Sequence, residues 1–142
     1  MPPRPHREGL PGQYCRLEPL DMGRHGGALH AANSLDAEGR MWTYLSYGPF
    51  GSRAAYEAWL QTVCGRDDPL FFAIIEGSTG AAAGLASYLR IDPPNGCIEI
   101  GHLAFSPALQ RTTAATEALY LMLRNVFALG YRRCEWKCDA LN

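Results

Sequence analysis

Three apolar stretches separated by two short turns constrain the fold of this chain more than any other feature. They span residues 70–76, 81–91 and 97–105, and the intervening residues 77–80 and 92–96 are rich in glycine, proline and small polar side chains. Apolar runs of this length bounded by turn residues are typical of buried β-strands. The sequence therefore predicts three strands that follow one another as an antiparallel meander.

The residues after this meander predict a helix and one further strand. Thr113 can cap a long helix with a wide apolar face, and Gly130 stands where a left-handed residue commonly ends a helix. Residues 132–139 are then predicted to form the last strand. A strand, a helix and a strand of one sheet form a right-handed crossover between parallel strands. A crevice opens where such a pair diverges beside antiparallel strands, so we expect a ligand there.

The N-terminal half adds one strand and two helices. Residues 14–20 alternate as a short strand, Asp21 can cap a helix that runs to Ala32, and Ser52 can cap a second helix. The resulting order β, α, α, β, β, β, α, β predicts an α+β fold with mixed α/β layers, in which helices cover both faces of a central mixed sheet. Residues 1–12 contain four of the ten prolines and are expected to be a flexible arm, so that residues 13–142 form a single domain.

Charge and hydropathy exclude several classes of function. Thirteen basic and fourteen acidic residues give a formal net charge of −1. This balance offers neither the cationic footprint of a nucleic-acid-binding protein nor a polybasic membrane patch, so we expect no nucleic-acid and no membrane partner. No apolar stretch reaches the ~18–20 residues of a membrane span, and the N-terminus lacks the apolar core of a signal peptide, so a cytoplasmic location is expected.

The five cysteines predict neither a disulfide framework nor a metal site. They are scattered along the chain without a CxxC pair, and we expect reduced, mostly buried thiols and no metal. Cys134 and Cys138 are expected to share one face of the last strand, too far apart for a metal site on that strand, so burial is the favoured interpretation.

Residues 98–118 are the segment most informative about chemistry. They predict a strand, a loop of small residues and the beginning of a helix. Such a loop presents successive backbone N–H groups at the positive end of the helix dipole, which favours binding of a phosphate or pyrophosphate group. The alternative is an ordinary connection between a strand and a capped helix.

The same segment resembles the acyl-CoA-binding motif of the GNAT N-acetyltransferase superfamily, most closely the branch that includes the ribosomal-protein alanine N-acetyltransferases. Gln110 matches the first position of that motif, Thr113 stands where a glycine is usual, and Ala115 fills a Gly/Ala position. The tetrad Ala115-Thr116-Glu117-Ala118 matches outright. Further agreement comes from Gly84, from residues 99–101 and from the aromatic cluster at 42–50, so the resemblance covers residues 14–142.

The resemblance implies a function, direct transfer of an acetyl group from acetyl-CoA to a primary amine of a protein N-terminus or a small molecule. It implies that the main chain of Leu103 and Phe105 pairs with the pantetheine arm, and that the loop holds the pyrophosphate. The residues implied at the loop are Gln110, Arg111, Thr112, Thr113, Ala114, Ala115 and Thr116. Threonine at position 113 requires a negative φ there, or else a lower affinity for the cofactor.

Glu99 is the predicted general base, because transfer needs a neutral amine. With a period of two it shares a strand face with Gly101, Leu103 and Phe105. His102 faces the other side and is expected to be a structural or surface histidine, the alternative being a general base. The alternative for Glu99 is a sheet residue paired with a neighbouring Arg or Tyr.

The aromatic cluster is a candidate wall of the acceptor pocket. Trp42, Tyr44 and Tyr47 are its predicted substrate-contacting residues, and the alternative is an ordinary hydrophobic cluster under a loop. 

Compared with the family, the chain stops at Asn142, before the strands that usually help to line the CoA channel. The strand at 132–139 would then be an exposed apolar edge. We expect a shortened form of a longer protein, a short product without activity, or a homodimer that covers this edge. The alternative function is a non-catalytic acyl-CoA-binding or interaction module.

Overall fold

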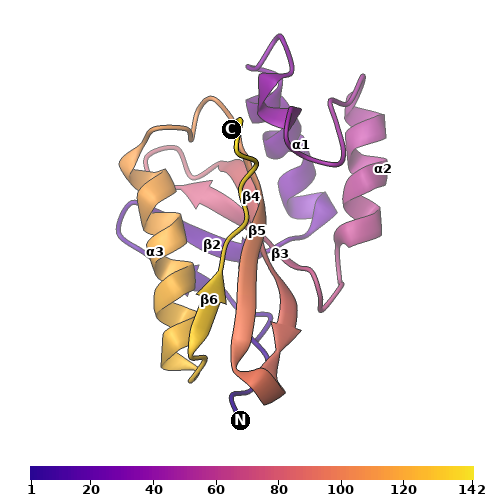
Figure 1. The fold of residues 1–142 in the computed structure, drawn as a ribbon. Coiled ribbons are helices and arrows are strands. Elements are labelled where there is room, and N and C mark those ends of the chain that lie inside the picture. Colours follow the sequence, from indigo (N-terminus) through magenta and orange to yellow (C-terminus); the bar gives the residue numbers. More distant parts are fainter.

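A computed structural model describes residues 1–142 and contains one six-stranded sheet in the order β1-β2-β3-β4-β5-β6 (Figure 1). Neighbouring strands from β1 to β5 are antiparallel, whereas β5 and β6 are parallel. The strands are β1 (Leu10–Pro11), β2 (Cys15–Pro19), β3 (Leu70–Glu76), β4 (Ala82–Asp92), β5 (Cys97–Phe105) and β6 (Arg133–Glu135). The predicted meander and the parallel crossover are both confirmed.

Three helices cover the two faces of this sheet, as Figure 1 shows. Helices α1 (Met22–Asn33) and α2 (Arg53–Val63) lie on one face, and α3 (Thr113–Ala128) lies on the other. The α3 face holds a core cluster of 19 buried residues, including Tyr88 and Met122, and the opposite face holds a cluster of 12 that includes Trp42. The predicted mixed layers with helices on both faces are confirmed. Two 3-10 turns, η1 (Arg40–Trp42) and η2 (Pro93–Asn95), complete the fold.

The helix ends follow the predicted capping pattern with one correction. Asp21 accepts the N–H of Arg24, and Ser52 accepts the N–H of Ala55. The cap of α3 is Thr112 instead of Thr113, because Thr112 has extended backbone angles and its hydroxyl accepts the N–H of Ala115. Gly130 adopts a φ of 102°, as expected after the last turn of a helix.

Two β-bulges interrupt the pairing of β4 with β5. At the first, Arg90 and Ile91 of β4 lie opposite Ile98 alone, and at the second two residues of β5, His102 and Leu103, lie opposite Ala86. Arg90 and His102 have φ values of 45° and 50°, in the left-handed region that non-glycine residues seldom adopt. An extra residue in one strand shifts the alternation of side chains beyond it.

The bulge at His102 makes the predicted side-chain faces of β5 wrong in part. Leu103 and Phe105 pack on the α3 cluster, together with Ile98 and Ile100. Glu99 alternates with these isoleucines and therefore lies on the α1 and α2 face, as does Gly101. His102 contacts Phe71 of the cluster beneath those helices, so it shares a face with Glu99 instead of opposing it.

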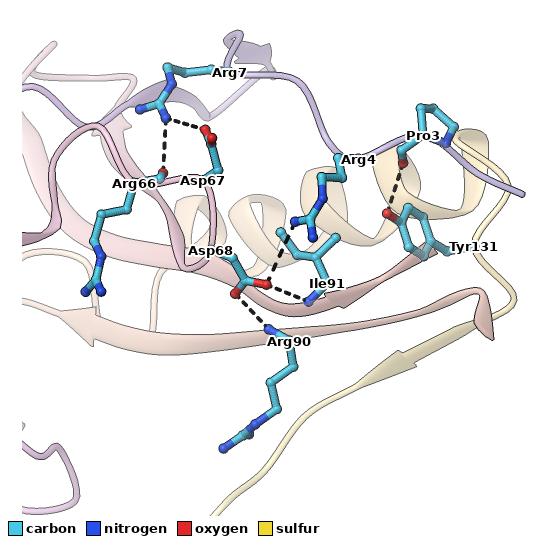
Figure 2. Close-up of polar contacts among 9 residues, drawn as sticks. All are labelled: Pro3, Arg4, Arg7, Arg66, Asp67, Asp68, Arg90, Ile91 and Tyr131. Carbon is cyan, nitrogen blue, oxygen red and sulfur yellow. Dashed lines mark hydrogen bonds and ion pairs between the residues drawn. The ribbon is translucent and has the colours of Figure 1, made fainter. Parts of the chain in front are cut away.

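The N-terminal segment is held against the domain, in contrast to the expected flexible arm (Figure 2). Tyr131 donates to the carbonyl oxygen of Pro3 at 2.9 Å, and Arg7 donates to Asp67 at 2.8 Å. Arg4 lies 4.0 Å from Asp68, and β1 pairs with β2. These anchors are contributed by residues about 60 and 128 positions away in the chain, so the local proline content does not indicate them.

The C-terminal strand is shorter than predicted. Only three residues pair with β5, and the segment 136–142 is exposed coil. Cys134 is half-buried and Cys138 is exposed, so the expected burial of Cys138 is wrong. Among the other free thiols, only that of Cys15 is buried. None of the helices combines the length and the hydropathy that crossing a bilayer requires. No group of three metal-ligating side chains is present.

Candidate functional site

A cavity of about 800 Å³ lies where β5 and the segment that follows β6 diverge. The pairing of β6 with β5 ends at Glu99, so the edge of β5 from Gly101 to Phe105 has no neighbouring strand on that side. Residues from β4, β5, the η1 region and the C-terminal segment form the walls. The structure thus contains a crevice at the predicted divergence of the parallel pair.

The loop between β5 and α3 presents unpaired backbone donors next to this edge. The N–H groups of Arg111, Thr112, Thr113 and Ala114 make no hydrogen bond within the protein. The Gln110 side chain donates to the carbonyl oxygen of Phe105 at 2.8 Å and so closes the loop. These donors lie at the positive end of α3, an arrangement suited to a phosphate group.

A second cavity of about 650 Å³ adjoins the loop, and Phe105 lines both cavities. The residues that line the second cavity are Phe105, Arg111, Thr112, Thr113, Ala115, Thr116 and Leu119. Leu103 and Gln110 line the first. Of the predicted cofactor-binding residues, only Ala114 lines neither cavity, and its side chain is buried.

Threonine at position 113 is compatible with the backbone of the loop. The residue of this loop with a positive φ is Arg111, at 60°, whereas Thr113 begins the regular turns of α3. A β-branched side chain therefore meets no left-handed backbone there. The sequence left two possibilities, a negative φ at Thr113 or a lower affinity for the cofactor. The structure has the negative φ.

Glu99 is buried and paired with cations. Its side chain is 5% exposed, and its Oε2 accepts from Arg90 Nη1 and lies 3.6 Å from Lys137 Nζ. The carboxylate of Asp68 accepts the N–H groups of Arg90 and Ile91, each at 3.0 Å, and thereby fixes the bulge that carries Arg90 (Figure 2). This pairing agrees with the alternative interpretation of Glu99, a sheet residue paired with a neighbouring arginine.

His102 lines the larger cavity in a half-buried position. Its Nδ1 lies 3.2 Å from Tyr47 Oη, and its ring packs 5.3 Å from Phe71 between centroids. Burial lowers the pKa of His102 below its ordinary value, the nearby carboxylate of Glu99 opposes this shift, and Arg90 adds to it. The ring is therefore neutral at pH 7.

The three predicted aromatic residues occupy different environments. Tyr44 lines the cavity, and its hydroxyl donates to the carbonyl oxygen of Leu141 at 2.8 Å. Trp42 is buried edge-on against Phe50, which fits the alternative of an ordinary hydrophobic cluster. Tyr47 stacks on Trp59 at 4.2 Å and reaches the cavity only through His102. Burial raises the pKa of Tyr47, so its hydroxyl stays protonated.

Glu117 has a role that the sequence motif did not reveal. Its carboxylate accepts the backbone N–H groups of Gln13, Tyr14 and Cys15 at 2.7–3.0 Å. These bonds join the N-terminal part of α3 to the beginning of β2 and fix the helix end that carries the unpaired donors. Arg90 and Asp68 were likewise missed, because no local pattern marks a bulge or its acceptor.

Comparisons with known proteins place these features in a family. A model of the acetyltransferase (GNAT) domain matches residues 17–142. A GCN5-related N-acetyltransferase from Brucella melitensis is 45% identical, with a TM-score of 0.96, over 99% of this chain and 64% of that protein. A GNAT-family protein from Chromobacterium violaceum is 38% identical, with a TM-score of 0.88, over 99% of this chain and 70% of that one.

A more distant likeness concerns the fold alone. RimL, a ribosomal L7/L12 α-N-protein acetyltransferase, is 21% identical, with a TM-score of 0.75, over 95% of this chain and 74% of RimL. The chain spans 64% of the Brucella protein, which is less than two thirds of that protein's length. No curated protein sequence matches it.

Proposed function

Because this chain belongs to the GNAT acetyltransferase family, we propose that it transfers the acetyl group of acetyl-CoA directly to a primary amine. One observation carries the proposal. Four unpaired N–H groups at the end of α3 adjoin the open edge of β5, and that edge leads into the cavity of about 800 Å³. A phosphate site, an extended groove and a cavity therefore follow one another, in the order that an acyl-CoA molecule requires.

The residues of the loop and of β5 fit this substrate. The N–H groups of Arg111 to Ala114 bind the pyrophosphate at the helix end, where small side chains let it approach. The unpaired main chain of β5 between Leu103 and Phe105 pairs with the amides of the pantetheine arm, as an added strand would. Backbone groups thus supply most of the binding, which agrees with a threonine at position 113.

Acetyl-CoA supplies an activated acetyl group as a thioester, and the cavity accepts the amine. The acceptor is a protein N-terminus or a small-molecule amine, and Tyr44 forms part of the wall against which it lies. An amine attacks only through its free electron pair, so the site must remove a proton from the ammonium form. The walls must also exclude water from the thioester.

A non-catalytic acyl-CoA-binding module is the second candidate. The ion pair between Glu99 and Arg90 favours it, because this buried carboxylate is already paired within the protein and has a structural role there. Both candidates share the loop and the open strand edge, and they differ only in turnover.

Two measurements on the same protein test the proposal. Isothermal titration with acetyl-CoA is expected to show binding, and a thiol assay with a panel of amines and peptides is expected to show release of CoA. Binding without turnover across the panel would favour the non-catalytic module. Absence of any heat at high acetyl-CoA concentration would contradict both candidates.

A further inference from the structure

The imidazole of His102 has one nitrogen without a partner in the cavity wall. Its Nδ1 is bonded to Tyr47 Oη at 3.2 Å, whereas its Nε2 makes no hydrogen bond within the protein. The residue lines the cavity of about 800 Å³ from the strand whose open edge is assigned to the pantetheine arm. In the tautomer that carries its proton on Nδ1, the lone pair of Nε2 is available to a group inside the cavity.

The backbone of His102 is in an unfavourable conformation that its surroundings maintain. His102 lies at the β-bulge of β5 and has a φ of 50°. Without that bulge its ring would face the other side of the sheet. Left-handed non-glycine residues are energetically unfavourable and persist where the surrounding packing over-determines them, often at functional sites. The bulge is therefore the feature that brings this ring into the cavity wall.

Packing fixes the orientation of the ring. The ring centroids of Phe71 and Tyr47 lie 5.3 Å and 5.8 Å from the centroid of the His102 ring, and the interplanar angles are 32° and 31°. Tyr47 is itself held by its stacking on Trp59. When Nδ1–H donates to Tyr47 Oη, the lone pair of Nε2 is fixed in place.

The neighbouring carboxylate is committed to other partners. Glu99 accepts from Arg90, and Lys137 lies nearby. Asp68 holds this part of β4 by accepting the N–H groups of Arg90 and Ile91, as Figure 2 shows. Protonation of Glu99 would remove the negative charge that pairs with these two cations, which both lie at its Oε2. His102 takes part in no ion pair, although burial and Arg90 disfavour its protonated form.

The charged and titratable groups around His102 come from several elements. Arg90 of β4, Glu99 of β5 and the hydroxyl of Tyr47 act on it most directly, and β3 contributes only the apolar Phe71. The remaining titratable or charged residues that line the cavity are Asp36, Arg40, Tyr44, Lys137, Cys138 and Asp139. Burial dominates among these influences and favours the neutral ring.

We propose that His102 is the general base that deprotonates the acceptor amine, with Tyr47 as its positioning residue. This inference rests on the proposed acetyl transfer. Nε2 takes a proton from the ammonium group, and the resulting imidazolium is stabilised by its Nδ1–H bond to Tyr47. The lone pair of the free amine then forms the C–N bond, while the C–S bond breaks and its electrons leave with sulfur. The second amine proton passes to the thiolate, and His102 returns its proton to solvent.

Nuclear magnetic resonance of ¹⁵N-histidine-labelled protein tests the ground state without turnover. We expect the signal that is lost in His102→Asn to show the Nδ1–H tautomer at pH 7, with a pKa below the ordinary value of 6.5. An Nε2–H tautomer, or a ring protonated at pH 7, would overturn the proposal. Asparagine is chosen because it tolerates a positive φ and keeps a group that can bond Tyr47.

Kinetics of the same variant test the catalytic role. His102→Asn is expected to keep its affinity for acetyl-CoA and to lose about 10²–10⁴-fold in kcat/KM at pH 7, the range typical of general-base catalysis. The rise of kcat/KM through the His102 pKa should also disappear. Tyr47→Phe should shift that pKa with a smaller loss of rate, and the exposed His6→Asn should match the wild type.

The outcomes separate the inference from the proposed function. An active wild type with a smaller loss in His102→Asn would overturn the assignment of the base and leave acetyl transfer standing. A wild type without binding or turnover would contradict acetyl transfer itself. If His102→Asn does not fold, His102→Gln and the tautomer measurement on the wild type decide the question.

Discussion

Glu117 Oε1 lies 2.7 Å from the backbone nitrogen of Tyr14, although 103 residues separate them. The same carboxylate also accepts the N–H groups of Gln13 and Cys15. One side chain thus joins the end of α3 that presents the unpaired donors to the beginning of the second strand. The glutamate of the Ala-Thr-Glu-Ala tetrad has a structural role at this junction.

Replacement of Glu117 by Gln should weaken this junction. The amide keeps one acceptor oxygen but loses the charge and the acceptor for Gln13, so the free energy of unfolding should fall by about 1–2 kcal/mol. Chemical denaturation measures the change. Glu38→Gln is the matched control, because Glu38 pairs with Arg40 on the surface and its loss should cost less than about 0.5 kcal/mol. Equal effects of the two substitutions would contradict the assigned role.

The stability contributed by Glu117 should depend on pH. Partial burial alone would raise the pKa of Glu117, but the N–H groups of Cys15, Tyr14 and Gln13 outweigh this and lower it below 4.5. A lowered pKa in the folded state stabilises the protein above the unfolded pKa, and this contribution is lost as the pH falls through the folded value. The difference in stability between wild type and Glu117→Gln should therefore shrink below about pH 4.5. A difference that is constant down to pH 2 would argue against it.

Replacement of Thr113 by Pro should reduce the affinity for acetyl-CoA without unfolding α3. Proline suits the first position of a helix, and Thr112 has the extended backbone, φ −113° and ψ 161°, that precedes proline readily. The backbone N–H donor is lost together with the threonine side chain, and loss of the donor should raise the dissociation constant about 10–100-fold, as for a hydrogen bond to a charged group. Thr113→Ala keeps the donor and serves as the control in the same titration. Unchanged affinity in Thr113→Pro would remove this N–H from the phosphate site.

Replacement of Glu99 by Gln should affect stability more than catalysis. The buried ion pair with Arg90 is lost, so the free energy of unfolding should fall by about 1–3 kcal/mol. With His102 as the base, kcat/KM should fall less than about tenfold, far less than removal of a general base costs. Thermal unfolding and steady-state kinetics give the two numbers. A loss of several hundred-fold in a stable variant would assign the base to Glu99.

Alkylation should distinguish the five cysteines. Cys138 is exposed, and burial together with the nearby Glu117 raises the pKa of Cys15 to about 12. Iodoacetamide at pH 8 should therefore modify Cys138 first and leave Cys15 unmodified until the protein unfolds. Peptide mass spectrometry identifies the sites, and Cys138→Ser should abolish the fast phase. Early modification of Cys15 would contradict its buried position.

Local sequence patterns determined most of the secondary structure. The apolar runs that form β3, β4 and β5 can be identified as strands from local sequence alone, because each is long, apolar and followed by turn residues. The caps Asp21 and Ser52 are equally local, since a capping side chain bonds an N–H three residues away. The loop that opens α3 was found for the same reason: its donors and its helix are contiguous in the chain.

The faces on which the side chains of the site lie, and their partners, depend on long-range contacts that no local pattern predicts. A period of two placed His102 opposite Glu99, and one extra residue in β5 reversed that relation. The bulge at Arg90 likewise depends on Asp68, which lies 22 residues earlier and accepts its N–H. A bulge arises from the register between two strands and from groups that reach it from elsewhere, so neither strand alone encodes it. Local patterns were enough to indicate the family, the layers and the loop of unpaired donors, whereas long-range pairing sets which side chains of β5 line the cavity.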